Sequence, residues 1–479
     1  MSLSKQRVAL ILGPLIFAIL QFLKAPSGMS PEGYSILTAT IWIAIWWVFE
    51  AVPISVTAFL PIILFPLSGA VNISDTTAAY GHKYIFLYIG GFFIAKAIEK
   101  WNLHKRIALN IIHVIGTNSG YVILGFMVAT AFLSMWISNT ATSVMMLPIG
   151  MSIVAQLNEN KSISEIQKLD FGKALMLGIA YSASIGGMAT LIGTPPNLVF
   201  AAFIKETYGT EISFWQWFKF GLPIAIPLLI IGWLYLTRIA FKINRIKLTG
   251  GKKEITKQLN ALGSIGKEEK HVLIVFVATA FAWITRSFIL QKINPFIDDS
   301  IIALIAGVSL FIIYSKKSQK PLLSWEEAVQ IPWGIIILFG GGMALAAGFE
   351  SSGLALWLGQ QMEVFKGLPF FLMILLTITL VNFITEVTSN LATIAMLLPI
   401  LAPIALTLQI DPYTIMIAAT VAASCAFMLP VATPPNAVVF GSGLLKISDM
   451  MRAGIWMNLI SIIVLSIMVY FFLPLIWNV

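Results

Sequence analysis

Two short stretches decide the fold of this chain: SNTATSVMMLPI at residues 138–149 and SNLATIAMLLPI at residues 389–400. Each places a Ser-Asn pair in the middle of a long apolar segment. A second motif, Thr-Pro-Pro-Asn, follows each stretch, at residues 194–197 and 433–436. The offsets are 389 − 138 = 251 and 433 − 194 = 239 residues. The chain therefore contains an internal repeat.

The composition predicts an all-α polytopic membrane protein. Of 479 residues, 58% are hydrophobic and only 11% are charged, whereas a soluble chain carries about 25% charged residues. A single soluble core stops growing near about 250–300 residues. Many apolar runs reach the roughly 17–25 residues that span a bilayer. These runs are continuous rather than alternating, which argues against an outer-membrane barrel.

The charge pattern sets the expected topology. The net charge of +9 comes from cations in short loops beside apolar runs, which follows the positive-inside rule and does not indicate a nucleic-acid partner. Lys5 and Arg7 place the N-terminus in the cytoplasm, and Asp298 and Asp299 fall outside. We expect about eleven transmembrane helices plus two re-entrant hairpins in the cytoplasmic membrane, with an external C-terminus. An odd number of crossings separates the repeat copies, so the two copies have opposite orientations.

The interrupted segments predict a transport site. A broken helix frees backbone N–H and C=O groups, which cost several kcal/mol each in hydrocarbon and so must line a buried or wet site. The N-terminus of a half-helix suits a carboxylate. Proline removes a donor and leaves carbonyls that attract sodium. A tight turn or a plain kink is the alternative, but paired interruptions in both halves favour a binding site near the midplane.

Few charged side chains accompany these interruptions. Neither broken region contains Lys or Arg, so an anion there needs cations that arrive with it. Glu386 lies four residues before Asn390; it could take a proton, help a cation site or make a local structural bond, and we favour the last. Arg286 lies late in its span and is expected to reach outward. The sequence has no phosphate-binding loop and no nucleophile–base motif, so we do not expect an enzyme.

A family resemblance rests on these motifs together with Glu99-Lys100-Trp101-Asn102-Leu103. Over nearly its whole length the chain resembles the divalent anion/sodium symporter family. The resemblance implies a homodimer, co-transported sodium ions, no organic cofactor, and an elevator in which a transport domain slides along a scaffold. It divides the chain into five parts: scaffold helices with an interfacial arm (1–118), the first transport half (119–241), a basic cytoplasmic linker (242–270), the second scaffold half with its arm (271–367), and the second transport half (368–479).

The resemblance also implies ligand sets. The first sodium ion is expected at Ser134, Ser138, Asn139 and the backbone near Gly187. The second is expected at Thr385, Thr388, Asn390 and the backbone near Ala432. The substrate carboxylates are expected at Asn139, Thr140, Ser389, Asn390, Thr433 and Pro434. Supporting positions are Thr194, Pro195, Pro196, Asn197, Pro435, Asn436 and Leu391.

The two halves are not equal, because Leu391 stands where the first half has Thr140. One hydroxyl that could reach a carboxylate is therefore missing. We predict sodium-coupled symport of di- or tricarboxylates of the succinate, malate and fumarate class. A sodium-independent dicarboxylate exchanger and a sulfate carrier of the same fold are the alternatives. The sequence leaves open which anion is carried, the number of sodium ions and the role of Glu386.

Overall fold

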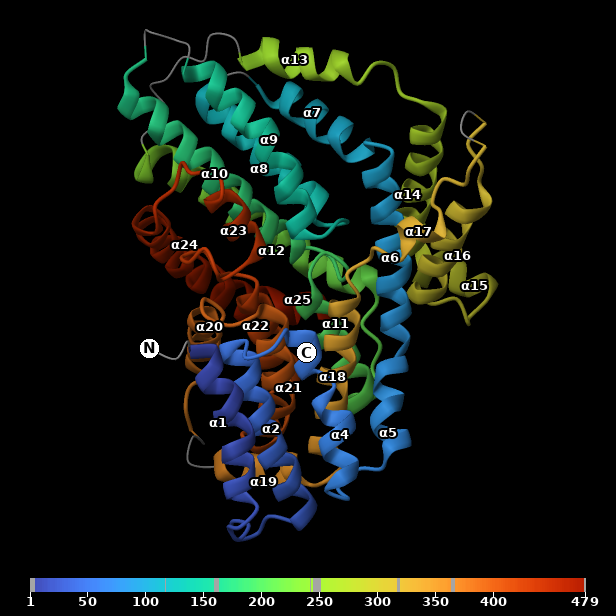
Figure 1. Ribbon diagram of the computed structural model, residues 1–479, viewed down its shortest axis with the longest axis vertical. Coiled ribbons are helices and arrows are strands. Elements are labelled where there is room, and N and C mark those ends of the chain that lie inside the picture. Colours follow the sequence, from blue (N-terminus) through green and yellow to red (C-terminus); the bar gives the residue numbers. More distant parts are fainter. Residues whose placement is uncertain are drawn as a thin grey trace.

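The protein is a bundle of helices (Figure 1). A computed structural model describes residues 5–116, 118–158, 163–241, 243, 251–316, 319–362 and 367–477, with the backbone alone for 251–253. Within these residues the only β-type pairing is an isolated bridge between Tyr314 and Pro321. The helices up to the first interruption are α1 (Lys5–Leu20), α2 (Pro31–Phe49), α3 (Ile54–Thr57), α4 (Leu60–Leu67), α5 (Ile73–Ala78), α6 (Lys83–Lys100), α7 (Leu103–Ile115) and α8 (Ser119–Ser134).

The remaining helices are α9–α16 and α17–α25. The first group is α9 (Asn139–Asn158), α10 (Glu165–Gly187), α11 (Pro195–Tyr208), α12 (Phe214–Leu234), α13 (Gly251–Ala261), α14 (Lys267–Thr285), α15 (Gln291–Ile293) and α16 (Asp299–Ile312). The second is α17 (Trp325–Ala328), α18 (Trp333–Ser351), α19 (Leu354–Gln361), α20 (Phe370–Ile384), α21 (Asn390–Thr407), α22 (Pro412–Ala423), α23 (Pro434–Phe440), α24 (Ile447–Ile467) and α25 (Leu473–Trp477).

Seven helices of the described chain are long and apolar enough to cross a membrane, and five more apolar helices are shorter. The seven are 31–49, 139–158, 214–240, 267–293, 333–351, 390–407 and 447–477. The apolar stretch between Ile54 and Leu67 forms two short helices, α3 and α4, instead of one continuous helix. Pro61 explains the split, because its ring clashes with the carbonyl four residues earlier and it has no N–H to continue α3. The total of about eleven crossings stays a prediction.

The predicted interruptions are confirmed at all four positions. Helix α8 ends at Ser134 and α9 begins at Asn139, while α20 ends at Ile384 and α21 begins at Asn390. Helices α11 and α23 begin at the first proline of each Pro-Pro pair, where a missing N–H costs nothing. The starts of α8 and α20 also differ by 370 − 119 = 251 residues. The local structure therefore breaks at matching positions in the two halves.

The basic segment 242–270 contains a helix. Its residues 244–250 lie outside the described chain, and α13 follows, drawn across the top of Figure 1 beside α7 and α9. Gln258 Nε2 donates to Ser152 Oγ of α9 at 2.7 Å. Arg106 of α7 pairs with Glu269 at 2.5 Å. This segment therefore packs against α7 and α9.

Close helix contacts depend on glycine. A Cβ on Gly90 of α6 would lie 2.5 Å from the backbone of Ala303 in α16, and one on Gly186 of α10 would lie 2.2 Å from the carbonyl oxygen of Ala131 in α8. Because no side chain fits at either place, these helix pairs touch through their backbones. Figure 1 places α6, α14 and α16 together on one side of the molecule, with α8, α9 and α10 across from them.

Candidate functional site

A cavity of about 1070 Å³ joins the four interruptions. Its lining includes both Ser-Asn tips and both Pro-Pro breaks. From the predicted site it contains Ser138, Asn139, Thr140, Thr194, Pro195, Pro196, Thr388, Ser389, Asn390, Leu391, Ala432, Thr433, Pro434 and Pro435. These segments are up to about three hundred residues apart in the sequence, yet they meet at one place. The structure thus brings together the residues that carry the two motifs.

The remaining predicted residues lie directly behind the tips. Ser134 and Thr385 are fully buried, as are Asn197 and Asn436. A Cβ on Gly187 would lie 2.6 Å from Asn139 Oδ1, so position 187 must be glycine for the first tip to sit where it does. These five residues support the cavity wall rather than line it.

Several oxygens converge behind the first tip. Ser134 Oγ donates to the carbonyl oxygen of Ala183 at 2.7 Å, and it is also in close contact with Asn139 Oδ1. Asn139 Oδ1 faces only acceptors, with the Ala183 oxygen at 3.2 Å and the Gly193 oxygen at 3.3 Å. Two arrangements would give these oxygens a partner. Either the Asn139 amide is rotated so that its nitrogen donates to them, or a cation lies among them.

The second tip repeats this arrangement. Thr385 Oγ1 donates to Asn390 Oδ1 at 2.6 Å and to the carbonyl oxygen of Ala423 at 3.1 Å. Thr388 is engaged locally, with its hydroxyl 2.6 Å from Thr393 Oγ1. In both halves a hydroxyl therefore links the tip asparagine to the last turn of the helix before the Pro-Pro break.

The asparagine of each Thr-Pro-Pro-Asn motif ties its break together. Asn197 Nδ2 donates to the carbonyl oxygen of Thr190 at 2.7 Å, with those of Met188 and Gly187 at 3.3 and 3.4 Å. Asn436 Nδ2 donates to the carbonyl oxygens of Leu429 and Ala426 at 2.9 and 3.2 Å. Both amides thus satisfy carbonyls that the broken helices release, as the hydrocarbon interior requires.

Glu386 is a buried carboxylate bound by backbone. It is 4% exposed, and its oxygens accept hydrogen bonds from the N–H groups of Phe427, Met428 and Leu429 at 2.8–3.2 Å. Asn458 Nδ2 donates to it at 2.7 Å. Of the three roles left open by the sequence, this geometry agrees with a structural one, but the bonds are long-range and not local. Its partners lie 41–72 residues away, so no local pattern could have named them.

The predicted site lacks the side of the cavity that α1, α3 and α6 form. Lys5, Glu50, Ser55, Tyr88 and Phe92 also line it. They come from α1, the α2–α3 turn, α3 and α6, none of which carries a repeated motif. Glu50 offers the one local signal, because it ends α2 in the left-handed conformation with φ 46°, which is uncommon for a residue other than glycine.

Comparison with known proteins gives a consistent assignment. A family model described as the sodium:sulfate symporter transmembrane region matches residues 4–478. The chain is 46% identical over 480 residues to the sodium-dependent dicarboxylate transporter SdcS of Staphylococcus saprophyticus, covering 98% of this chain and 92% of that protein. It is 44% identical over 482 residues to SdcS of Staphylococcus aureus, covering 99% and 92%.

Two solved transporter structures share the fold. The Alcanivorax borkumensis YdaH transporter superposes with a TM-score of 0.61 at 13% identity, over 92% of this chain and 99% of that one. MtrF of Neisseria gonorrhoeae superposes with a TM-score of 0.54 at 13% identity, over 96% and 94%. At this level of identity the likeness is one of architecture.

Proposed function

The chain belongs to the sodium:sulfate symporter family, and we propose that it imports dicarboxylates of the succinate, malate and fumarate class together with sodium. The observation that carries this proposal is the convergence of two Ser-Asn tips and two Pro-Pro breaks on one cavity. The relatives at 44–46% identity are named sodium-dependent dicarboxylate transporters. Transport, rather than catalysis, is the activity of both the family and these relatives.

The oxygens behind the tips support two sodium sites. Sodium is a hard cation that prefers oxygen ligands. In the first half the acceptor-only surroundings of Asn139 Oδ1 fit an ion held by Ser134, Ser138, Asn139 and the backbone near Gly187. In the second half Thr385, Thr388, Asn390 and the backbone near Ala432 form the corresponding set. Each asparagine then connects an ion behind the tip to the cavity in front of it.

Helix N-termini support binding of the carboxylates. Helices α9, α11 and α21 all begin at residues that line the cavity: Asn139, Pro195 and Asn390. Each N-terminus carries a partial positive charge, and α9 and α21 also offer free N–H donors, whereas α11 begins with two prolines that have none. Together with Thr140, Ser389, Thr433 and Pro434 they can hold a dianion. Sodium ions offset the rest of its charge, because no Lys or Arg lies in the interruptions.

The matching interruptions support an inverted repeat that moves as one body. We assign 119–241 and 368–479 to the moving transport unit and 1–118 and 271–367 to the scaffold, within a homodimer. The cavity reaches the surface beside Lys5 and Glu50. The positive-inside rule places these residues at the cytoplasmic side, so this conformation is open inward, with the N-terminus cytoplasmic and the C-terminus external.

Reconstituted transport tests the proposed function. Proteoliposomes with an inward sodium gradient are expected to accumulate labelled succinate against its own gradient, because sodium binding orders both tips. Replacing sodium by potassium should reduce uptake to the level of empty liposomes. Equal uptake in potassium would remove sodium coupling and favour an exchanger, and competition by sulfate but not by succinate would favour a sulfate carrier.

Gly187→Ala tests the first sodium site. The added Cβ would lie 2.6 Å from Asn139 Oδ1 and 2.8 Å from its Nδ2, so the tip must shift. Overpacking of this kind costs about 1–3 kcal/mol, which corresponds to a roughly 10–100-fold higher sodium concentration for half-maximal uptake. Gly81→Ala is the matched control, since nothing lies within 4 Å of its added Cβ. Unchanged sodium dependence in Gly187→Ala would refute the placement of this site.

A further inference from the structure

A cluster of five charged side chains joins the α11–α12 loop to three other helices. Glu211 of that loop lies 2.7 Å from Arg286 Nη1, at the end of α14, and 3.1 Å from Lys83 Nζ, at the start of α6. Asp299, at the start of α16, lies 3.4 Å from the same Arg286 nitrogen. Asp298 lies 3.5 Å from Lys83. The expectation that Arg286 reaches outward is therefore wrong, because Glu211 and Asp299 hold it inside the protein.

Burial makes this cluster different from a surface ion pair. Arg286 is 4% exposed and Asp299 is 2% exposed. Asp299 Oδ2 also accepts a hydrogen bond from the backbone N–H of Phe214 at 2.7 Å. A surface pair contributes little, whereas separating a buried charge from its partner is strongly unfavourable. The arrangement is thus stable only while Glu211 and Phe214 stay next to α14 and α16.

Every one of the cluster's contacts from the α11–α12 region crosses the proposed boundary between moving unit and scaffold. Glu211 and Phe214 belong to 119–241, and Lys83, Arg286 and Asp299 belong to the scaffold. Nearby, Glu206 of α11 lies 2.9 Å from His82 Nε2, which precedes α6. A movement of the transport unit along the scaffold must therefore break the cluster.

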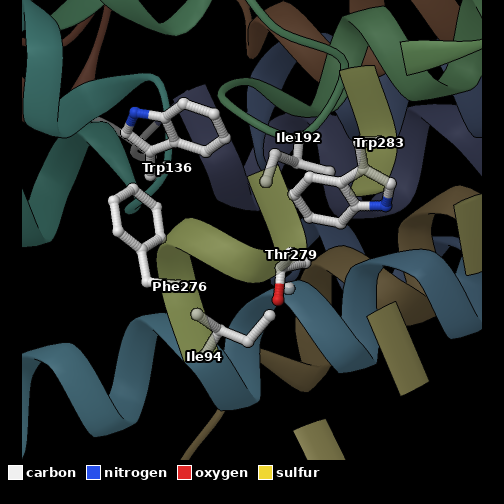
Figure 2. Close-up of a pocket in the computed structure, with 7 residues that line it drawn as sticks. Ile94, Trp136, Ile192, Phe276, Thr279 and Trp283 are labelled. Atoms are coloured by element: carbon white, nitrogen blue, oxygen red, sulfur yellow. The ribbon is translucent and has the colours of Figure 1, made fainter. Parts of the chain in front are cut away.

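The same boundary is apolar further along α14. Trp136, just before the first tip, packs against Phe276 with ring centroids 5.0 Å apart, and Phe214 stacks on Trp283 at 4.8 Å. Figure 2 shows Trp136 and Ile192 facing Ile94 and Thr279 across a small cavity of about 10 Å³. Apolar surfaces exchange one contact for another as they slide, since such contacts are non-directional. Charged groups cannot exchange partners in this way, because each needs a partner of opposite charge. The cluster therefore sets the preferred position of residues 119–241 relative to α6, α14 and α16.

In the predicted topology the cluster and the cavity mouth fall on opposite sides of the membrane. In the predicted topology the starts of α6 and α16 and the end of α14 are external, and Lys5 and Glu50 at the mouth are cytoplasmic. The charged contacts are thus made while the cavity is open inward. We propose that Glu211 is an external latch: held by Lys83 and Arg286, it stabilises the inward-open conformation and must be released each time the site turns outward. This inference rests on the proposed function.

Accessibility of one introduced cysteine tests the latch. Val431 lines the cavity and is 81% exposed, while the native Cys425 is fully buried. Val431→Cys is therefore labelled with a membrane-impermeant maleimide, added to right-side-out or to inside-out vesicles. Adding Glu211→Gln is expected to raise the ratio of external to internal labelling about tenfold, within the usual range of conformational coupling. Glu326→Gln, at an exposed carboxylate, should leave the ratio unchanged.

Two further results complete the test of the Glu211 latch. Glu206→Gln removes the partner of His82 and is expected to shift labelling in the same direction by a smaller factor, so it serves if Glu211→Gln does not fold. An unchanged or lower external-to-internal ratio in the folded variant would overturn the latch. Because labelling needs no transport, that failure is distinct from failure of the proposed function, which appears as absent sodium-driven uptake by the unsubstituted chain.

Discussion

Asn139→Ala and Asn390→Ala are each expected to reduce sodium-driven succinate uptake to background. Each asparagine oxygen lies next to the hydroxyl behind its tip, Ser134 or Thr385, and each asparagine also lines the cavity. Losing one oxygen from a charged ligand costs about 1.5–3 kcal/mol, or roughly 10–100-fold in affinity. Because the ion and the dianion lose a contact together, the two losses multiply in the initial uptake rate.

The measurement is the initial rate in proteoliposomes at saturating sodium, beside a thermal-shift titration with sodium alone. Asn110→Ala is the matched control, because Asn110 is exposed and bonds only its own helix at Arg106. The variants should remain folded, since Ala is compatible with the first position of α9 and α21. Uptake by either variant at the unsubstituted rate would refute the assignment of that tip.

The interruptions could be predicted because their cause is local. A Ser-Asn pair or a Pro-Pro pair inside an apolar segment ends a helix by itself, and the repeat showed that the event occurs in both halves. Four helix boundaries, at Asn139, Pro195, Asn390 and Pro434, follow from this alone. A shared cavity was expected as well, because paired interruptions in the two halves of a transporter point to one binding site.

Contacts between side chains of different helices could not be predicted, because the sequence has no repeating pattern that tells which helices lie next to one another. Lys5 and Tyr88 line the cavity through the arrangement of α1 and α6. Arg286 looked like a residue at a membrane surface, yet it binds Glu211 from a loop 75 residues earlier. Charged residues near predicted span ends therefore need the fold before a role can be assigned.

Glu386→Ala is expected to lower the free energy of unfolding more than any other single carboxylate change in residues 119–241 and 368–479. It would leave the N–H groups of Met428 and Leu429 and the Asn458 amide without their acceptor. Each unsatisfied buried donor costs about 1–3 kcal/mol, so we expect a loss of roughly 3 kcal/mol or more in unfolding free energy. The loop that positions Ala432 and Thr433 would also lose its anchor.

The first half shows why this carboxylate is an anchor of the second half alone. Its counterpart, 251 residues earlier, is Met135, and there Trp217 Nε1 and Thr190 Oγ1 hold the break through the carbonyl oxygens of Met188 and Met135. In the first half, side-chain donors hold the helix break, whereas in the second half the acceptor Glu386 holds it.

Thermal unfolding and succinate uptake of Glu386→Ala and Glu386→Gln test this anchor, with the exposed Glu326→Ala as control. Gln keeps one side-chain oxygen at the same length but turns a donor toward the loop, so it should fall between Ala and the unsubstituted chain in unfolding temperature. Uptake should fall with the same ranking, because Ala432 and Thr433 depend on the loop. If Glu386→Ala unfolds and transports like the control, the carboxylate neither anchors the break nor places the second site.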